Sequence, residues 1–316
     1  MTAIVERHEE LARIEVDGAP CVVYPGVTGP VALGDEVLVN EQARQLGLGS
    51  GGFDVLYANL TRGLELDPVP GAHVMTLPYT PLQHAVVHAE EDGVLAPGLD
   101  GTPVVCCSLH SQLSPVCAGL RGARVAYVQI AGGALPVSLS DSVRALRERG
   151  LVELAVAASP CHAGDVQCAN VASALAWAAA RGYDAIVCAV GPGIVGTGSD
   201  LGHGAPSAAE AANAASALGG SPVVAARYSD ADPRERHRGL SHHTRAVLRL
   251  CRGEVVLAWP AGLAAPAGVD HQEVDVDGWR EACAGLRLDH MGRGPDEDPW
   301  FFASAFAAGR RARALI

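Results

Sequence analysis

The chain has 316 residues, a formal net charge of −12 and 49% hydrophobic residues, so it can bury a large core in about two domains. Every basic side chain other than histidine is an arginine, which excludes a Schiff-base lysine and the lysine of a Walker phosphate loop. The acidic balance argues against nucleic-acid binding, and no apolar run approaches the roughly 18 residues that cross a bilayer.

The first 72 residues have the pattern of short strands separated by tight turns. Turn pairs stand at Asp17-Gly18 and Gly34-Asp35, and the stretch FDVLYANL follows a run of glycines. Short strands punctuated in this way are typical of a small barrel or curled sheet. We therefore expect residues 1–72 to form a small β-barrel-like unit.

From residue 73 onward, apolar runs alternate with segments of helical pattern. Runs such as PVVCCSL, RVAYVQI and DAIVCAV are almost wholly apolar, which indicates strands buried on both faces, as in a parallel sheet. The alternation predicts an α/β fold with a doubly wound, mostly parallel sheet in residues 73–260. The expected strands lie within 73–79, 103–109, 124–130, 151–159, 184–190, 221–229 and 254–260, and the expected helices near 81–91, 112–120, 139–149, 166–181, 207–218 and 241–252.

Residues 261–316 begin with a link rich in proline, glycine and alanine and continue into the loop HMGRGPDEDPWFF. Asp298 can cap a helix that has Pro299 at its first position, and the RRAR sequence places cations at the negative end of that helix. We expect this segment to pack on the core, and its charged loop around Arg293 is a candidate lid over a cleft.

Polar groups gather in the loops that follow the expected strands, where open α/β sheets bind their ligands. His110 follows one strand, Gly132 and Gly133 follow the next, and Cys161-His162 follow another. This coincidence predicts a cleft at the carboxyl edge of the sheet, with His110 as a candidate catalytic base. Cys161 is a candidate nucleophile, but adjacent side chains on extended backbone point to opposite faces, so an inert loop cysteine is the simpler interpretation.

The segment GPGIVGTGS stands between an expected strand and an expected helix. Glycines let a backbone approach a ligand and direct its amides at an anion, although this segment matches neither the dinucleotide fingerprint nor the Walker loop. A crossover loop that needs glycine for its backbone angles is the structural alternative. The predicted anion-binding residues are Gly191, Gly193, Gly196, Thr197, Gly198 and Ser199, with Gly132 and Gly133 beside them.

The densest cluster of candidate metal ligands and acid–base groups comprises Asp230, His237, His242 and His243. Imidazole together with carboxylate suits a divalent transition metal. If Ser241 caps the helix that follows, His242 and His243 lie at the positive end of its dipole, which keeps them neutral. We expect the four residues to meet and to hold a metal or move protons, with Arg236 as a catalytic residue that neutralises developing charge. A hydrogen-bonded structural network is the alternative.

Four motifs together resemble an uncharacterised bacterial family. They are LHSQL at 109–113, GPGIVGTGS at 191–199, ADPRERHRGLSHHT at 231–244 and MGRGPDEDP at 291–299. The resemblance is to a family of unknown function common in actinobacteria and firmicutes, and it spans most of the chain. It implies a small N-terminal β region and an α/β core, but no activity. The family tends to have a longer glycine-rich loop where this chain has SPCHAGD, which sets Cys161 apart as particular to this sequence.

These features predict an enzyme, a metal- or acid/base-assisted hydrolase or transferase, that acts on a small anionic substrate such as a phosphorylated one. A non-catalytic ligand-binding or regulatory protein that uses the same cleft is the alternative. The expected cofactor on the first interpretation is a divalent metal, and homo-oligomerisation stays open. Nine cysteines without framework spacing, and an N-terminus without a signal-like pattern, predict a cytoplasmic protein with reduced thiols and no membrane partner.

Overall fold

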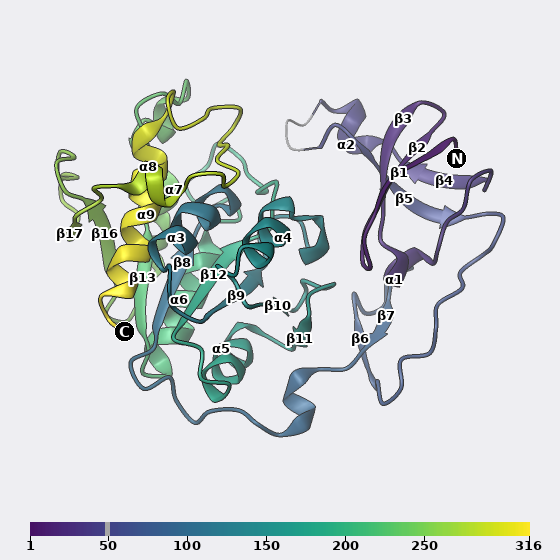
Figure 1. Ribbon diagram of the computed structural model, residues 1–316, viewed down its shortest axis with the longest axis horizontal. Coiled ribbons are helices and arrows are strands. Elements are labelled where there is room, and N and C mark those ends of the chain that lie inside the picture. Colours follow the sequence, from purple (N-terminus) through teal and green to yellow (C-terminus); the bar gives the residue numbers. More distant parts are fainter. Residues whose placement is uncertain (48–50) are drawn as a thin grey trace. The chain divides into compact units, whose positions relative to one another are not determined.

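The structure is a computed structural model that describes residues 1–47 and 51–316. The chain divides into two compact units, residues 1–88 and residues 89–316 (Figure 1). Each unit contains its own sheet and its own buried apolar cluster. Among the helices in the described part of the chain, none combines the length and the apolar character needed to cross a bilayer.

The N-terminal unit contains a five-stranded sheet with the order β1-β2-β3-β5-β4. Ile14, Val23 and Leu56 are among the buried residues that form its core. A separate antiparallel hairpin follows the sheet. The strands are β1 (Ala3–Arg7), β2 (Ala12–Val16), β3 (Ala19–Val23), β4 (Val37–Asn40) and β5 (Asp54–Asn59), the hairpin is β6 (Val74–Thr76) with β7 (His84–Val86), and the short helices are α1 (Pro25–Thr28) and α2 (Gln42–Gln45).

The hairpin corrects one expectation about the start of the α/β region. The stretch 73–79 does not join the large sheet, and β7 stands where a helix was expected near 81–91. Leu77 and Tyr79 adopt φ angles of 49° and 62°, a region that ends a strand, and the chain turns back there to pair with itself. The domain boundaries at residues 72 and 260 remain predictions. The division between the two compact units falls between residues 88 and 89.

The second unit contains an eight-stranded sheet in which every pair of neighbours is parallel. This confirms the prediction of an α/β fold with a parallel sheet. The order is β11-β10-β9-β12-β8-β13-β16-β17. The strands are β8 (Pro103–Cys107), β9 (Val125–Ile130), β10 (Leu154–Ala158), β11 (Val166–Cys168), β12 (Ala185–Val190), β13 (Ser221–Ala225), β16 (Val256–Pro260) and β17 (Gln272–Val274).

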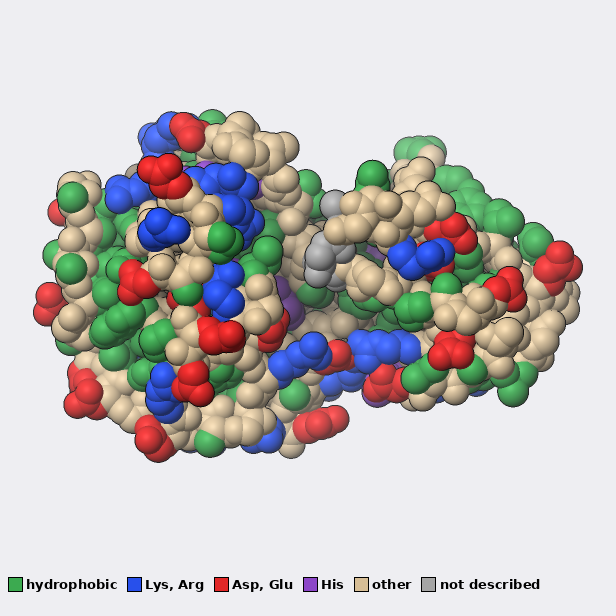
Figure 2. Space-filling view, turned by 90° about the horizontal axis from the view of Figure 1, so that it is seen from above, with side chains coloured by type: hydrophobic (Ala, Val, Ile, Leu, Met, Phe, Trp, Pro, Cys, Tyr) green, Lys and Arg blue, Asp and Glu red, His purple; other side chains and the backbone are tan. Residues whose placement is uncertain are grey.

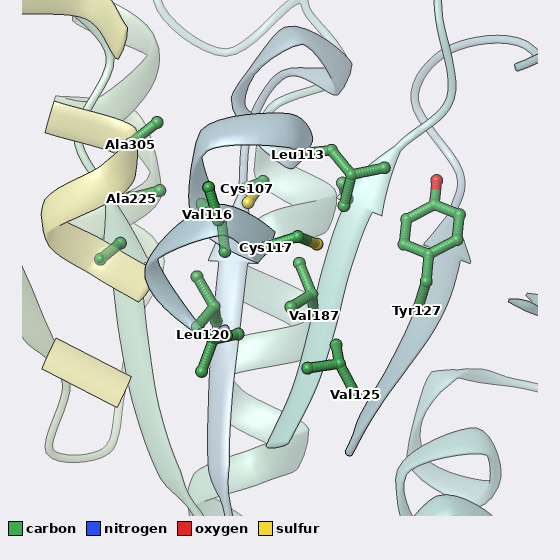
Figure 3. Close-up of a cluster of buried hydrophobic side chains, with 14 of the residues drawn as sticks. Cys107, Leu113, Val116, Cys117, Leu120, Val125, Tyr127, Val187, Ala225 and Ala305 are labelled. Carbon is green, nitrogen blue, oxygen red and sulfur yellow. The ribbon is translucent and has the colours of Figure 1, made fainter. Parts of the chain in front are cut away.

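Alternate residues of these strands enter two different cores, as strand geometry requires. Val105, Tyr127 and Val187 face one core, which α3 and α9 cover (Figure 3), whereas Val104, Val128 and Ile186 face the other, which α5 and α6 cover. Burial on both faces explains why the strand sequences are apolar throughout. The helices are α3 (Leu113–Gly119), α4 (Asp141–Glu148), α5 (Val171–Ala180), α6 (Pro206–Ala217), α7 (His242–Leu250), α8 (Trp279–Ala282) and α9 (Pro299–Arg313).

The strand order places one group of loops side by side. β8 lies in the middle of the sheet, the chain then builds β9, β10 and β11 on one side, and it returns to insert β12 beside β8 before continuing to β13. The carboxyl ends of β12, β8 and β13 are therefore neighbours at the same edge. This reversal of direction is where open α/β sheets form their binding sites.

Candidate functional site

The loops that follow β9 and β12 press together backbone to backbone. Val195 donates its amide to the carbonyl oxygen of Gly132 at 2.9 Å, and a Cβ atom added to Gly132 would lie 2.5 Å from the carbonyl oxygen of Gly204. Glycine is required at position 132 because the two backbones approach so closely there. Thr197 and Ser199 hydrogen-bond to each other, and their amides are also bonded within the loop.

This loop ends by carrying His203 to the start of α6. His203 is buried, and its Nε2 lies 2.9 Å from the carbonyl oxygen of Asp200. A carbonyl oxygen only accepts hydrogen bonds, so Nε2 carries the proton and Nδ1 has a lone pair. Nδ1 is buried and has no hydrogen-bond partner in the described structure. Sequence reasoning missed this residue, and its only signal was a histidine between two glycines at the end of the glycine-rich segment.

The start of α7 supplies two more histidines. Ser241 caps the helix, as predicted, because its hydroxyl oxygen accepts a hydrogen bond from the amide of His243 at 3.2 Å. His242 and His243 lie in the first turn, and the Nε2 atom of His242 is buried without a hydrogen-bond partner. His237 precedes the helix, and its Nδ1 lies 2.8 Å from the Ser241 hydroxyl.

Four imidazole rings, those of His203, His237, His242 and His243, form what we call the histidine cluster. The rings of His203 and His243 are stacked with centroids 3.9 Å apart, and the His242 centroid lies 4.5 Å from that of His243 and 5.0 Å from that of His203. The centroid of His237 lies 4.8 Å from that of His242. The structure therefore brings together three of the four residues that we expected to meet, with His203 in place of Asp230.

The histidines of the cluster are held in the neutral form. Burial, and after it the charges of Arg227 and Arg234, lower the pKa of His237 to about 3. Burial and then Arg227 hold the pKa of His243 far below its usual range. An unsatisfied buried nitrogen costs roughly 1–3 kcal/mol, so the two bare nitrogens of His203 and His242 are a destabilising feature unless something binds to them.

Arg227 connects the histidine cluster to a partly buried ionic network. Its Nη1 donates a hydrogen bond of 2.9 Å to Nδ1 of His243, and its Nη2 lies 3.6 Å from the carboxylate of Asp232. Asp232 also binds Arg234 at 2.8 Å and Arg293 at 3.4 Å. Burial lowers the pKa of Arg227 to about 9, helped by repulsion from Arg234. We call Arg227, Arg234, Arg293, Asp232 and Asp298 the arginine–carboxylate network.

The C-terminal segment completes this network. Asp298 precedes α9 as expected, but its carboxylate does not cap the helix and instead accepts hydrogen bonds from the Ser229 hydroxyl at 2.6 Å and from Nε of Arg293 at 3.1 Å. His290 stacks on Phe301 with centroids 3.7 Å apart. The tail thus contributes buried charges next to the loop that follows β13, and the suggestion that it closes as a lid remains a prediction.

His110 lies in the loop after β8 and is held on both sides. Its Nδ1 is 3.2 Å from the carbonyl oxygen of Val190, so Nδ1 carries the proton, and its Nε2 is 2.6 Å from the Ser140 hydroxyl, which must donate. Burial lowers the pKa of His110 to about 4, an effect that the hydrogen bond to Val190 only partly offsets. The ring is therefore a neutral and firmly positioned group.

Three other predicted residues lie outside the histidine cluster. Asp230 is exposed and accepts a hydrogen bond from the Tyr228 hydroxyl, and the side chain of Arg236 is exposed. Cys161 is fully buried, and burial raises the pKa of its thiol to about 12, so the thiol is protonated at neutral pH. Figure 2 shows arginine side chains gathered on one face of the second unit.

A hollow of about 630 Å³ lies elsewhere, at the amino ends of β9 and β10. It is lined by Val125, Arg124 and Glu153 among others, and Arg124 and Glu153 pair with each other there. The histidine cluster and the arginine–carboxylate network belong to the loops at the carboxyl ends, so we place the candidate site there, where the buried charges and bare nitrogens lie.

Fold and site together define an α/β protein with neutral histidines beside a buried arginine, Arg227, at the carboxyl edge of a parallel sheet. The chain belongs to a family described as a protein of unknown function (DUF3866), whose model matches residues 20–309. No curated protein and no solved structure is found to match it.

Proposed function

We propose that the protein is an enzyme that binds a small anionic substrate at the carboxyl edge of its sheet and hydrolyses it or transfers a group from it. Neutral histidines, or a metal that they bind, supply the chemistry. The observation that supports this best is an excess of positive charge around the buried side chain of Arg227. The arginine–carboxylate network contains three guanidinium groups and only two carboxylates.

An anion would relieve the cost of this excess charge. The side chain of Arg227 is only 3% exposed, and its Nε has no hydrogen-bond partner in the described structure. Buried charges are expensive unless they are paired, and guanidinium groups match the geometry of phosphate and carboxylate oxygens. Arg227 also contacts His243, so an anion bound to Arg227 would lie next to the histidine cluster.

Binding of an anion would also make the histidines better proton acceptors. Part of the lowering of the pKa of His237 comes from Arg227 and Arg234, after the larger effect of burial. A negative charge between these groups offsets that repulsion and raises the pKa toward neutrality, where general acid–base catalysis is most efficient. A bound anion would therefore favour proton uptake by His237.

A ligand sensor without turnover is the second candidate. The carboxylate of Asp232 is held by Arg234, so it is not an available base. Hydrogen bonds from the side chain and amide of Arg234 outweigh burial and hold the pKa of Asp232 well below its usual range. Turnover separates the two candidates, because a sensor binds the anion without changing it.

The test uses inorganic phosphate and pyrophosphate as binding probes and a panel of phosphate monoesters for turnover. Calorimetry should show binding of a probe by the full chain, and Arg227→Gln should weaken it at least tenfold. The matched control is Arg245→Gln, an exposed arginine on α7, which should bind as the wild type does. Equal binding by Arg227→Gln and the wild type, with both proteins folded, would overturn the proposal. Binding without turnover of any ester would favour the sensor.

A further inference from the structure

We propose that His203, His242 and His243 together hold one divalent transition metal ion. One ring nitrogen from each residue can be chosen so that all three atoms lie within 4.8 Å of one another. The three residues come from two segments, the end of the glycine-rich loop and the first turn of α7. The inference rests on the proposed function for the reaction it would serve, but not for the binding of the ion itself.

His203 is already in the tautomer that a metal requires. Its Nε2 donates to the carbonyl oxygen of Asp200 at 2.9 Å, which leaves the lone pair of Nδ1 free. Histidine ligands usually donate their second nitrogen to a carbonyl or carboxylate, which fixes the ring and its tautomer. Nδ1 is buried and has no partner in the described structure, so its lone pair is directed at nothing that the protein supplies.

His242 presents a second unsatisfied nitrogen. Its Nε2 is also buried without a hydrogen-bond partner among the described residues, and its ring centroid is 5.0 Å from that of His203. Buried polar atoms are almost always hydrogen-bonded, so two bare nitrogens on neighbouring rings need an explanation. A purely structural hydrogen-bond network would have satisfied them, whereas a cation satisfies both through their lone pairs.

His243 is the third ligand, and Arg227 competes for it. Nδ1 of His243 accepts a hydrogen bond from Arg227 at 2.9 Å, so the neutral ring carries its proton on Nε2. To ligate through Nε2, the ring must release that proton to solvent and take one up on Nδ1, which keeps it neutral. Arg227 must then release His243, and its Nη2 already lies 3.6 Å from Asp232. Metal binding and the Arg227–His243 hydrogen bond therefore exclude each other.

The ligand set selects the class of ion. Three neutral imidazoles suit zinc, cobalt, nickel or copper, whereas magnesium and calcium prefer oxygen ligands. Three protein ligands leave a coordination position for water or for an anion, as in catalytic rather than structural zinc sites. An anion in that position would be close to Arg227, the residue that we propose for anion binding.

Titration of the full chain, stripped of metal with a chelator, tests the proposal. Cobalt binding is followed by its visible absorption, and zinc binding by competition with a chromophoric chelator. We expect one ion per chain and no competition from magnesium. His203→Gln keeps a hydrogen-bond donor for the Asp200 carbonyl, and His242→Phe keeps an aromatic ring in place of the imidazole. Each variant should weaken metal binding at least about 100-fold, which is more than the loss of affinity caused by removing a residue that only contacts a ligand. The matched control His271→Gln, whose ring contacts the Val269 carbonyl, should bind normally.

Arg227→Gln is the most discriminating variant in this experiment. The variant removes the like charge and the competing donor, and its amide oxygen can accept from Nδ1 of His243, so zinc should bind more tightly while phosphate binds more weakly. Failure of the wild type to bind one ion, or normal binding by folded His203→Gln or His242→Phe, would overturn the metal site. Phosphate binding by the metal-free chain tests the proposed function separately, so either proposal can fail without the other.

Discussion

Replacement of Asp232 by asparagine should lower the free energy of unfolding of the second unit by about 3 kcal/mol. The carboxylate is fully buried, with guanidinium nitrogens of Arg234, Arg293 and Arg227 at 2.8, 3.4 and 3.6 Å. Breaking a buried ion pair from one side costs about 3–5 kcal/mol, because the partner stays charged and unpaired. We expect the lower end of that range, because the side chains of Arg234 and Arg293 are 34% and 16% exposed and can be hydrated, whereas Arg227 cannot.

Urea denaturation followed by tryptophan fluorescence is the appropriate assay, because all four tryptophans lie between residues 177 and 300 and so report on this unit alone. The control is Asp230→Asn, two residues away in the same loop and exposed, which should change stability by less than about 0.5 kcal/mol.

The effect of Asp232→Asn should also depend on pH. Because the pKa of Asp232 is held below its ordinary value of 3.8, its stabilisation is present above that pH and is lost as the pH falls below it. The difference between the wild type and the variant should therefore shrink in acid. A loss no larger than that of the Asp230 control would show that the arginine–carboxylate network does not stabilise the fold.

Three further substitutions test other parts of the site. Burial lowers the pKa of His290 to about 3, so between pH 6.5 and 3 only the unfolded chain takes up a proton on this residue. As the pH falls through that range, this group should lower the free energy of unfolding by about 1.4 kcal/mol per pH unit. In urea titrations between pH 6 and 4, stability should therefore depend less steeply on pH in His290→Gln than in the wild type, and equal slopes would contradict this reasoning. Ser241→Ala should lower the free energy of unfolding by about 1 kcal/mol through loss of the helix cap, and an unchanged urea midpoint would contradict this role. Gly204→Ala should lower the free energy of unfolding by at least about 3 kcal/mol, because its Cβ would overlap the Gly132 carbonyl. In the control Gly198→Ala the new Cβ meets open space, so the melting temperature should change little. Similar melting temperatures for the two variants would refute the close packing.

The sheet was predictable because each strand contains its own signal. A short unbroken apolar run such as that around Val105 or Val187 is typical of a strand covered on both faces, and the structure confirms this. The short edge strands β11 and β17 were missed, since sequences such as QEV have no apolar pattern, and they become strands only by pairing with a neighbour. Strand order was also out of reach, because similar apolar runs can be arranged in many ways.

The candidate site also has some contacts that local sequence predicts and others that depend on distant residues. The cap of α7 was predictable because Ser241 and His243 are two residues apart, and the bond between them is local. Asp298 was predicted to cap α9 on equally local grounds, but its carboxylate bonds Ser229, which is 69 residues away. A long-range partner in a buried position outcompeted the local one, because a charge removed from water needs the strongest donors available.

By itself, the sequence determined that the chain is acidic, lysine-free and built on an apolar parallel sheet, and that His242 and His243 share one helix turn. Only the tertiary structure decided that His203 and Arg227 join them. These residues follow β12 and β13, which are brought to the two sides of β8 by the return of the chain to the middle of the sheet. Helix turns and caps are set by contacts within a few residues, whereas a site assembled from separate loops depends on strand order, which is chosen by the packing of the whole sheet.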